Sequence, residues 1–295
     1  MSLALNGAQT LHESKWLHSE IPQNQTVLDF IKTRCPWNEA VQDVGQRFEP
    51  HLSFDPKINS EAACAEVYEL YRDVGAVAWR SQPGLSLYGL SLSYNPSHAR
   101  DCWHVGSFGH PRYRSYSRYD YFRAVERDLQ NRVKDDYLDS LGFRALLPEL
   151  SDKPALSGFL NRFKAPVVRS TVRTINGCLT YPSIAGDGGM HQDDSPFEVL
   201  RINLCLTASD LFGIQYLGHP AQVFEQGKAL VVNTDHPHRA YIAGVSAIQR
   251  TNLIVGVTPW LDFEPEAGLW RLNDHFGRAH PYDLVRTGEL FNGNF

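Results

Sequence analysis

A series of short β-rich segments fills the second half of the chain and limits its fold more than any other feature. From residue 165 onward, apolar and β-branched stretches follow one another with turn residues between them and no helical spacers. We expect strands at Val167–Ile175, Cys178–Pro182, Val199–Thr207, Gly213–Leu217, Ala221–Phe224, Lys228–Asn233, Arg239–Ile242 and Thr251–Thr258. About eight strands at this spacing are typical of a double-sheet jelly roll. The predicted fold class is therefore mainly β with flanking helices, built on a cupin-like double-stranded β-helix core.

The sequence before residue 165 has a different texture. Residues 1–58 are polar and irregular, and we interpret them as an arm that wraps the core. Helical spacing and turn residues predict helices over Ser60–Val74, Phe122–Tyr137 and Pro154–Phe163, and strands over Ala76–Trp79 and Leu87–Leu92. In the first of these helices Ser60 is the expected N-cap and Gly75 the stop.

These patterns divide the chain into three parts. We expect an N-terminal helical and mixed extension over 1–164, a jelly-roll core over 165–262 and a C-terminal tail over 263–295, with one helix in Pro281–Leu290. The extension is expected to pack on the barrel, so that the three parts form one structural unit.

The segment 101–121 is dense in aromatic and basic residues, and Trp103 is the first of its aromatic residues. Three arginines alternate there with three tyrosines, at Arg112, Tyr113, Arg114, Tyr116, Arg118 and Tyr119. Guanidinium groups and aromatic faces together suit bases or anionic groups. The segment is thus either a lid or recognition loop, or a loop whose aromatic rings pack on the scaffold while its arginines face water.

Composition narrows the range of partners. A formal charge of -5 argues against general nucleic-acid affinity, because such binders usually carry a basic face. The five cysteines are scattered and odd in number, which favours reduced thiols over a disulfide framework. With no signal-peptide core and no long apolar run, we expect a soluble cytoplasmic protein with no membrane contact. A small-molecule partner fits best, and a peptide is the next choice.

The pattern His191-x-Asp193 follows a glycine-rich turn at Gly188–Gly189. Alternate residues of a strand share a face, so both side chains can point into the barrel. A further histidine pair, His236 and His238, follows about 45 positions later, beyond a predicted buried strand. Two histidines and one carboxylate form the facial triad that holds non-haem iron(II) and leaves coordination positions open. We therefore predict a metal site.

Several assignments within this site stay open. His238 is preferred over His236 as the distal ligand, because Pro237 stiffens the backbone before it and a strand pattern follows. His236 would then support the ligand from the second layer, or Asp235 would orient a ligand ring through its other nitrogen. Asp194 could replace Asp193, and all of these groups could instead be polar residues at a barrel rim.

Arginines on neighbouring strands would complete the site. Arg250 precedes a strongly apolar strand, and its planar guanidinium can hold a distant carboxylate through two parallel hydrogen bonds. Arg201 and Asn203 alternate with apolar residues, so they should face the metal-side cavity. Arg169 and Arg173 share a face of the first barrel strand, either toward the cavity or toward solvent. Within the cavity, these arginines suit a substrate carboxylate.

Together these residues resemble the 2-oxoglutarate/iron(II) dioxygenases. The motifs are His191-x-Asp193, Leu200–Arg201–Ile202–Asn203–Leu204, Gly227 followed by His238, and Arg250-Thr-Asn-Leu-Ile-Val-Gly-Val-Thr-Pro-Trp260. The closest branch is the aspartyl/asparaginyl β-hydroxylase-like group, and the similarity covers roughly residues 165–262. Two departures stand out. Asn203 occupies the place of a typical histidine, and Asp193 supplies a carboxylate that the vertebrate β-hydroxylases lack.

The resemblance implies a function and a set of roles. His191, Asp193 and His238 would bind Fe(II), with no catalytic residue beyond them. Arg250 would pair with the distal carboxylate of the co-substrate 2-oxoglutarate, with the hydroxyl of Thr180 helping it. Arg201 and Asn203 would meet the metal-side carboxylate or the substrate. Arg173, Trp103 and Arg239 are candidates for substrate contact. The reaction would use O2 to hydroxylate an unactivated C–H bond, releasing succinate and CO2.

Other functions remain open from the sequence. Within the oxygenases, an amino acid or other small polar metabolite is the first choice of substrate, ahead of a peptide side chain or a nucleic-acid component. Outside them, a cupin-like isomerase or metal-dependent binding protein would use a similar barrel with Zn or Mn, without O2 and without a need for Arg250.

Overall fold

The structure is a computed structural model that describes residues 51–82, 85–94, 109–111, 145–165, 167–177, 190–193, 199–207, 212–242, 248–264, 269–275 and 279–292. Its helical elements are α4 (Ser60–Asp73), η2 (Pro148–Asp152), α7 (Pro154–Leu160) and α8 (Pro281–Arg286). Its strands are β1 (His51–Phe54), β2 (Val77–Gln82), β3 (Leu85–Ser91), β4 (Ser93–Tyr94), β5 (Ala145–Leu146), β6 (Val167–Gly177), β7 (Leu200–Thr207), β8 (Phe212–Tyr216), β9 (Gln222–Val223), β10 (Ala229–Val232), β11 (His238–Ile242), β12 (Ile248–Val257), β13 (Leu261–Glu264) and β14 (Leu269–Leu272).

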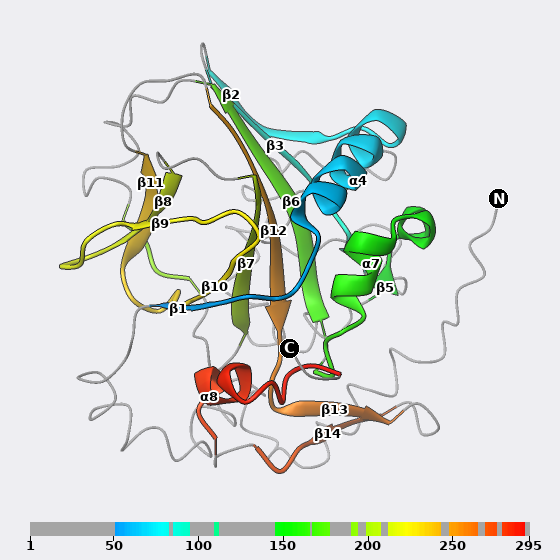
Figure 1. The fold of residues 1–295 in the computed structure, drawn as a ribbon, viewed down its shortest axis with the longest axis vertical. Helices are drawn as coiled ribbons and strands as arrows, with labels where there is room; N and C mark the ends of the chain where they lie inside the picture. Colours follow the sequence, from blue (N-terminus) through cyan, green and yellow to red (C-terminus); the bar gives the residue numbers. More distant parts are fainter. Residues whose placement is uncertain are drawn as a thin grey trace, which may run out of the picture.

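Two antiparallel sheets form the core of the molecule (Figure 1). The large sheet has the order β1-β10-β7-β12-β6-β3-β2, and the small sheet has the order β11-β8-β9. Residue 191 adds an isolated bridge beside β11. From β6 to β12 the chain crosses repeatedly from one sheet to the other, with β8 and β9 consecutive in the small sheet, which is the winding of a double-stranded β-helix. The predicted fold class is confirmed: a mainly β jelly roll with few helices.

Alternation along the strands of the large sheet separates two apolar cores. On β7, Ile202, Leu204 and Leu206 pack in one cluster with residues of α4 and α7, whereas Cys205 packs in another with Ile214 of β8. Side chains two residues apart share a face, so the helices cover one face of the large sheet and the small sheet covers the other. We call the face toward the small sheet the inner face.

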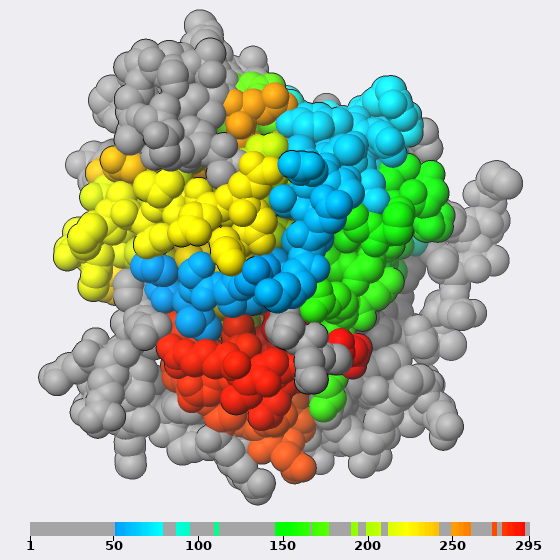
Figure 2. Space-filling view, viewed as in Figure 1, coloured from blue at the N-terminus to red at the C-terminus, as the bar shows by residue number. Residues whose placement is uncertain are grey.

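Residues before 165 contribute strands as well as helices. β1 pairs with β10 at one edge of the large sheet, and the hairpin β2–β3 extends the other edge through β6. In the space-filling view, the blue band that includes β1 lies on the surface between the yellow segment and red α8 (Figure 2). Residues 51–54 were predicted to be irregular, but pairing with the buried strand β10 satisfies their backbone groups and makes them a strand.

The helices differ in detail from the sequence prediction. Asn59, rather than Ser60, caps α4, because its side-chain oxygen accepts a hydrogen bond from the N–H of Ala62 at 3.0 Å. The helix ends before Gly75, whose φ of 96° suits glycine, as predicted. The expected helix over Phe122–Tyr137 lies outside the described residues. None of the helices in the described ranges has the length and apolar content needed to cross a bilayer.

Helix α4 holds α7 through a buried carboxylate. Glu66 accepts hydrogen bonds from the N–H groups of Ala155 at 2.9 Å and Leu156 at 2.8 Å, at the N-terminus of α7. These N–H groups have no partner within the helix, and the negative charge also suits the helix dipole. Glu66 thus fixes the layer of helices that covers the outer face of the large sheet.

We expect Glu66→Ala to lower the free energy of unfolding by about 1–3 kcal/mol, since two buried N–H groups lose their acceptor. Glu66→Gln should cost less, because one amide oxygen remains to accept. Glu61→Gln is the matched control: it lies on the exposed side of α4 and should change stability by roughly 0.5 kcal/mol or less. Urea denaturation measures all three, and equal losses for Glu66→Ala and the control would contradict the assigned contact.

Candidate metal centre

A bridge between two chain segments sets the position of two imidazoles. The N–H of His191 donates to the carbonyl of His238 and the N–H of His238 donates to the carbonyl of His191, each at 2.9 Å. Directly opposed residues of an antiparallel pair place their side chains on the same face. The ring centroids accordingly lie 4.5 Å apart. Sequence alone could place neither ring against the other, because 47 positions separate them.

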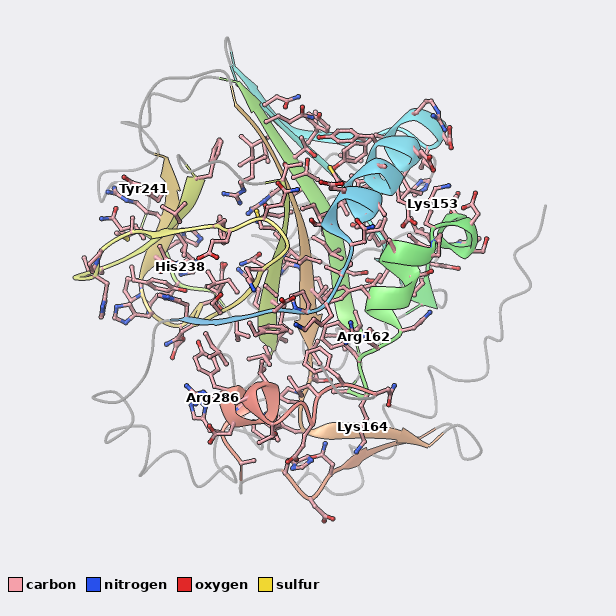
Figure 3. The ribbon with its side chains drawn as sticks, viewed as in Figure 1. Lys153, Arg162, Lys164, His238, Tyr241 and Arg286 are labelled. Atoms are coloured by element: carbon pink, nitrogen blue, oxygen red, sulfur yellow. The ribbon has the colours of Figure 1, made fainter. Side chains whose placement is uncertain are left out.

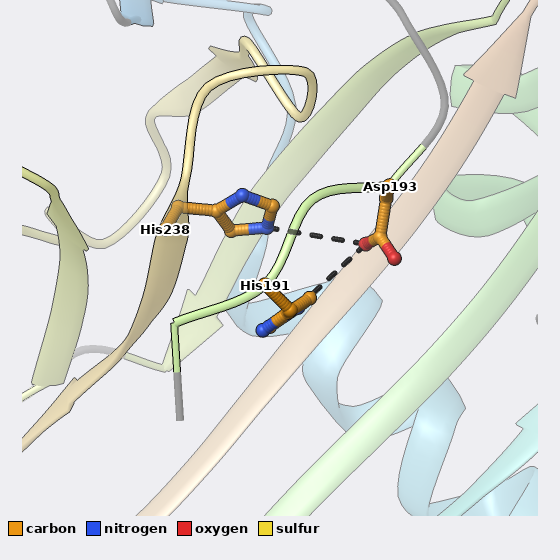
Figure 4. A group of neighbouring side chains, drawn as sticks. All are labelled: His191, Asp193 and His238. Atoms are coloured by element: carbon orange, nitrogen blue, oxygen red, sulfur yellow. Dashed lines mark ion pairs between the residues drawn. The ribbon is translucent and has the colours of Figure 1, made fainter. Parts of the chain in front are cut away.

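Asp193 joins the two rings from the same side. Its N–H donates to the carbonyl of Thr234 at 2.8 Å, so a second backbone hydrogen bond ties this segment to the residues before β11. Its Oδ2 lies 3.8 Å from Nε2 of His191 and 3.9 Å from Nε2 of His238 (Figure 4). Among the described residues these three form the one group that could hold a metal ion, with ligand atoms within 4.8 Å of one another. Metal–ligand bonds near 2.0–2.2 Å would require the side chains to close by roughly an ångström.

A backbone carbonyl orients the ring of His238. Nδ1 of His238 lies 2.9 Å from the carbonyl oxygen of His236, so an Nδ1–H donates there and Nε2 keeps its lone pair for a metal. The side chain is 6% exposed, and burial lowers the pKa of His238 more than this hydrogen bond raises it. A neutral imidazole is the form that binds a metal.

The choice between the two downstream histidines is decided by these contacts. His236 directs Nε2 toward the carbonyl of Leu217 at 3.1 Å, and its ring packs near Tyr216 and His219. His238 is thus the histidine that lies beside His191 and Asp193, and its role as a metal ligand stays a prediction. His236 does support the ligand ring, but through its backbone carbonyl, and the Asp235 side chain is not the group that orients it.

Arg201 holds the carboxylate of Asp193. The two side chains form an ion pair through NH1 of Arg201 and Oδ2 of Asp193. Burial raises the pKa of Asp193, but the charge and hydrogen bond of Arg201, followed by the two imidazoles, outweigh it and bring the pKa below its usual value. The carboxyl is thus ionised at neutral pH, as a metal ligand must be. Side-chain exposures of 53% for His191 and 34% for Asp193 leave the group accessible from solvent.

Arg250 is buried on the inner face of the large sheet, with 2% exposure. Its Nε donates to Oδ1 of Asn252 at 3.1 Å. The guanidinium carbon lies 4.6 Å from the ring centroid of Phe224 and 5.5 Å from that of Phe212, both within the range of cation–π contact. These contacts fix the plane of the guanidinium group.

Strand register arranges the polar residues of the inner face in rows. Arg201, Gly256 and Arg169 are neighbours across β7, β12 and β6 in the first row, and Asn203, Ile254 and Thr171 form the second. Cys205, Asn252 and Arg173 form the third row, and Arg250 and Ile175 continue the fourth. The first row is the one in contact with Asp193, through Arg201.

The predicted residues fall into four groups. His191, Asp193 and His238 come together, and Arg201, Asn203, Arg250 and Arg173 share the inner face. Arg239 lies on the opposite face of β11 from His238, where Nε and NH2 bind Oε1 of Gln215 at 2.9 and 2.7 Å. Its place in a substrate site stays a prediction that this contact does not favour. Thr180, Trp103, Asp194 and the segment 112–121 lie outside the described residues.

Asn252 is the residue that the sequence analysis missed. It is fully buried, it accepts the hydrogen bond from Arg250, and its Nδ2 has no hydrogen-bond partner. The signal was present, since Asn252 lies two residues beyond Arg250 and so shares its face of the strand.

Figure 3 places His238 on the small-sheet side of the molecule, away from Lys153 and Arg162 near α7.

Comparison with known proteins gives matches in structure but not in sequence. No family model and no curated protein matches the chain. An oxidoreductase of the 2OG-Fe(II) oxygenase family from Burkholderia pseudomallei matches at 14% identity over 74% of this chain and 90% of that one, with a TM-score of 0.35. A Pseudomonas putida prolyl-4-hydroxylase matches at 10% identity over 75% and 99%, with a TM-score of 0.31. HygX from Streptomyces hygroscopicus, solved with nickel and 2-oxoglutarate bound, matches at 9% identity over 74% and 85%, with a TM-score of 0.34.

These structures resemble the fold of this chain at low identity. TM-scores below 0.5 carry no argument about its chemistry, and they do not single out the aspartyl/asparaginyl hydroxylase branch. The assignment of the fold rests on the strand pairing described above, and any functional conclusion must rest on the chain's own residues.

We expect Asp193→Asn to weaken binding of Fe(II), or of Co(II) as a substitute, by at least about 100-fold, more than the loss of an outer-layer partner usually costs. Gln192→Ala is the control. Gln192 lies between the two ligands, but its Nε2 binds the carbonyl of Asp235, so metal affinity should be retained. Equilibrium dialysis under nitrogen measures both variants, and wild-type affinity in Asp193→Asn would remove the carboxylate from the ligand set.

Proposed function

We propose that the chain is a 2-oxoglutarate- and Fe(II)-dependent oxygenase. One observation carries the proposal: two imidazoles and a carboxylate converge on one side of a jelly roll that also buries Arg250 between its sheets. Two histidines with one carboxylate suit Fe(II) and leave positions open for other ligands. A closed set of four protein ligands, as in a structural zinc site, is not present among the described residues.

The donors of His191, Asp193 and His238 fit an iron ion in their protonation state as well as in their type. His238 is held neutral with Nε2 toward the group, and Asp193 is held ionised by Arg201. Arg201 stabilises the negative charge of Asp193. It also lies on the inner face, where the metal-side end of 2-oxoglutarate would lie. Asn203 is its neighbour on β7, and Oδ1 of Asn203 is buried without a hydrogen bond.

The far end of the inner face fits the distal carboxylate of 2-oxoglutarate. Arg250 brings a positive charge into a buried position, which favours an anionic partner. The adjacent Asn252 turns its Oδ1 to Arg250, so its Nδ2 remains as a buried donor that a carboxylate oxygen could accept from. We assign both residues to the co-substrate, with Arg250 as the charge partner and Asn252 as a second donor.

When bound, iron and 2-oxoglutarate together would supply the chemistry: O2-dependent decarboxylation to succinate and CO2, coupled to hydroxylation of a substrate C–H bond. The protein's own residues bind and orient the metal and the co-substrate. The triad fixes the metal at one end of the inner face, and Arg250 and Asn252 fix the co-substrate at the other. Phe212 and Phe224 pack on the guanidinium and exclude water from its charge.

For the prime substrate we propose an amino acid or other small polar metabolite. A peptide side chain is the alternative substrate for such an oxygenase. The relation to the aspartyl/asparaginyl β-hydroxylase-like branch rests on the sequence motifs alone. Succinate release in the presence of free amino acids, short peptides and nucleosides distinguishes these substrates. Only the class that contains the substrate should raise the rate of succinate release above the rate without substrate.

A cupin-like isomerase or metal-dependent binding protein is the rival from another class. It would have no use for the buried Arg250–Asn252 pair. Titration with Fe(II) and 2-oxoglutarate under nitrogen separates the two classes. We expect a metal-to-ligand charge-transfer absorption band that needs both components, and its absence would favour the rival.

We expect His191→Ala to abolish both this band and substrate-dependent succinate formation, because it removes one of three ligands. Gln192→Ala should retain both, since its side chain points to Asp235. Succinate is measured by chromatography after aerobic incubation. Turnover at the wild-type rate in His191→Ala would refute the ligand assignment.

Arg250→Ala should raise the 2-oxoglutarate concentration needed for half-saturation of the band, reflecting a loss of about 2–5 kcal/mol when one partner of a buried charge pair is truncated. The half-saturating concentration for Arg250→Lys should lie between those of the wild type and Arg250→Ala, since an ammonium cannot make two parallel hydrogen bonds. Arg239→Ala is the control, because Arg239 binds Gln215 on the other face of the small sheet. An unchanged requirement in Arg250→Ala would take Arg250 out of this role.

A further inference from the structure

The inner face carries more arginines than the proposed metal centre and its co-substrate would use. Four arginines lie on it, at positions 169, 173, 201 and 250, and Arg201 pairs with the carboxylate of Asp193. Arg201 is committed to Asp193, and the proposed function commits Arg250 to 2-oxoglutarate. The two arginines of β6 have no part in either assignment.

Register brings one of these two to the level of the metal centre. Gly256 of β12 is paired with Arg201 on one side and with Arg169 on the other. Two strand spacings of about 4.8 Å place the Cα atoms of the two arginines roughly 10 Å apart. Arg173 lies two rows further along, opposite Asn252 and close to the co-substrate end. Arg169 is therefore the arginine of β6 nearer to the metal ligands.

Gly256 lets the side chain of Arg169 lie across the sheet. A Cβ added at Gly256 would meet Cβ of Arg169 at 3.2 Å and its Cδ at 3.9 Å, and Cγ1 of Val199 at 2.8 Å. The aliphatic part of Arg169 thus occupies the space above Gly256, leaning from β6 toward β7. Any other residue at position 256 would require the side chain of Val199 or Arg169 to shift.

The second row adds polar groups that lack protein partners. Thr171 and Asn203 lie on either side of Ile254, with exposures of 1% and 6%. Oγ1 of Thr171 and Oδ1 of Asn203 form no hydrogen bond. Buried polar atoms in folded proteins are nearly always hydrogen-bonded to protein, water or a ligand, so these two atoms are available to a polar ligand.

We propose that Arg169 anchors an oxyanion of the prime substrate, a carboxylate or a phosphate, with the hydroxyl of Thr171 as a second contact. This inference rests on the proposed function and specifies its substrate class. A guanidinium binds either oxyanion through two parallel hydrogen bonds. Anchored beside the first row, the substrate lies next to the metal while 2-oxoglutarate extends toward Arg250. Arg169 then decides which molecules enter, and neutral compounds of the same shape are rejected.

The test compares matched pairs of compounds on the holoprotein, loaded with Fe(II) and 2-oxoglutarate under nitrogen. Amino acids are compared with their primary amides, and sugar phosphates with the free sugars, by calorimetry and by thermal shift. We expect binding by the anionic member of a pair and at least tenfold weaker binding by the neutral one. The carboxylate and phosphate arms show which oxyanion the site takes. Equal binding within every pair, or binding by no acid at all, overturns the proposal.

Variants of Arg169 locate the anion. For an acid that binds, Arg169→Gln should raise Kd by about ten- to a hundredfold, the usual effect of losing a charge-assisted hydrogen bond, and should leave the affinity for its amide unchanged. Arg169→Lys keeps the charge and should recover part of the affinity, which also covers the case in which the glutamine variant folds poorly. Arg286→Gln is the matched control, since Arg286 pairs with Asp283 on α8, and it should bind the acid as the wild type does. An unchanged Kd in Arg169→Gln overturns the proposal.

The charge-transfer band separates this inference from the proposed function. Arg169→Gln should still form the band with Fe(II) and 2-oxoglutarate at wild-type concentrations, because Arg250 and the triad are intact. A wild-type protein without the band refutes the oxygenase, whatever acids it binds. A wild-type band without selectivity for acids keeps the oxygenase and refutes the anion site.

Discussion

The backbone bridge between His191 and His238 is the interaction on which the site depends. It pairs a short segment ahead of β7 with the first residue of β11, and this pairing puts both rings on one face. Asp193 then follows from strand geometry, because it is two residues along on the same side. Without the bridge, His191 and Asp193 would not meet His238, which lies 47 positions beyond His191 in the sequence, and the three residues would form no site.

A jelly roll ordinarily fills the space between its sheets with apolar side chains, and this one does so only in part. Cys205, Ile214 and Leu230 form a small apolar cluster there, whereas Arg201, Asn203 and Arg250 bring charge and amide groups to the same face. Keeping charge and unpartnered amides in a buried layer costs free energy. The outer face, by contrast, packs apolar side chains on α4 and α7, and its buried hydroxyls at Thr174 and Thr251 bond to each other and to tyrosines of α4. This polar inner layer is where the proposed function places 2-oxoglutarate and an anionic substrate.

Much of this arrangement could be predicted from the chain. Strand runs and turn residues gave the fold class, and the alternation on β7 gave the faces of Arg201 and Asn203. The strand at residues 51–54 could not be predicted, because its apolar pattern is weak and its pairing with β10 is distant in sequence. Asn59 was missed as a cap because Ser60, an equally good cap by type, follows it directly. Asn252 was overlooked although its spacing from Arg250 placed it on the inner face.

The sequence by itself determined the kinds of donor that are available, the alternation that selects a face for each, and the periodicity that excludes a helical core. These follow from local geometry, which acts over a few residues. Only the tertiary structure decided which histidine meets Asp193, that Arg201 pairs with that carboxylate, and that Arg169 shares a row with Arg201 across Gly256. Those contacts depend on the register between strands far apart in the chain, and register is fixed by the packing of both sheets together.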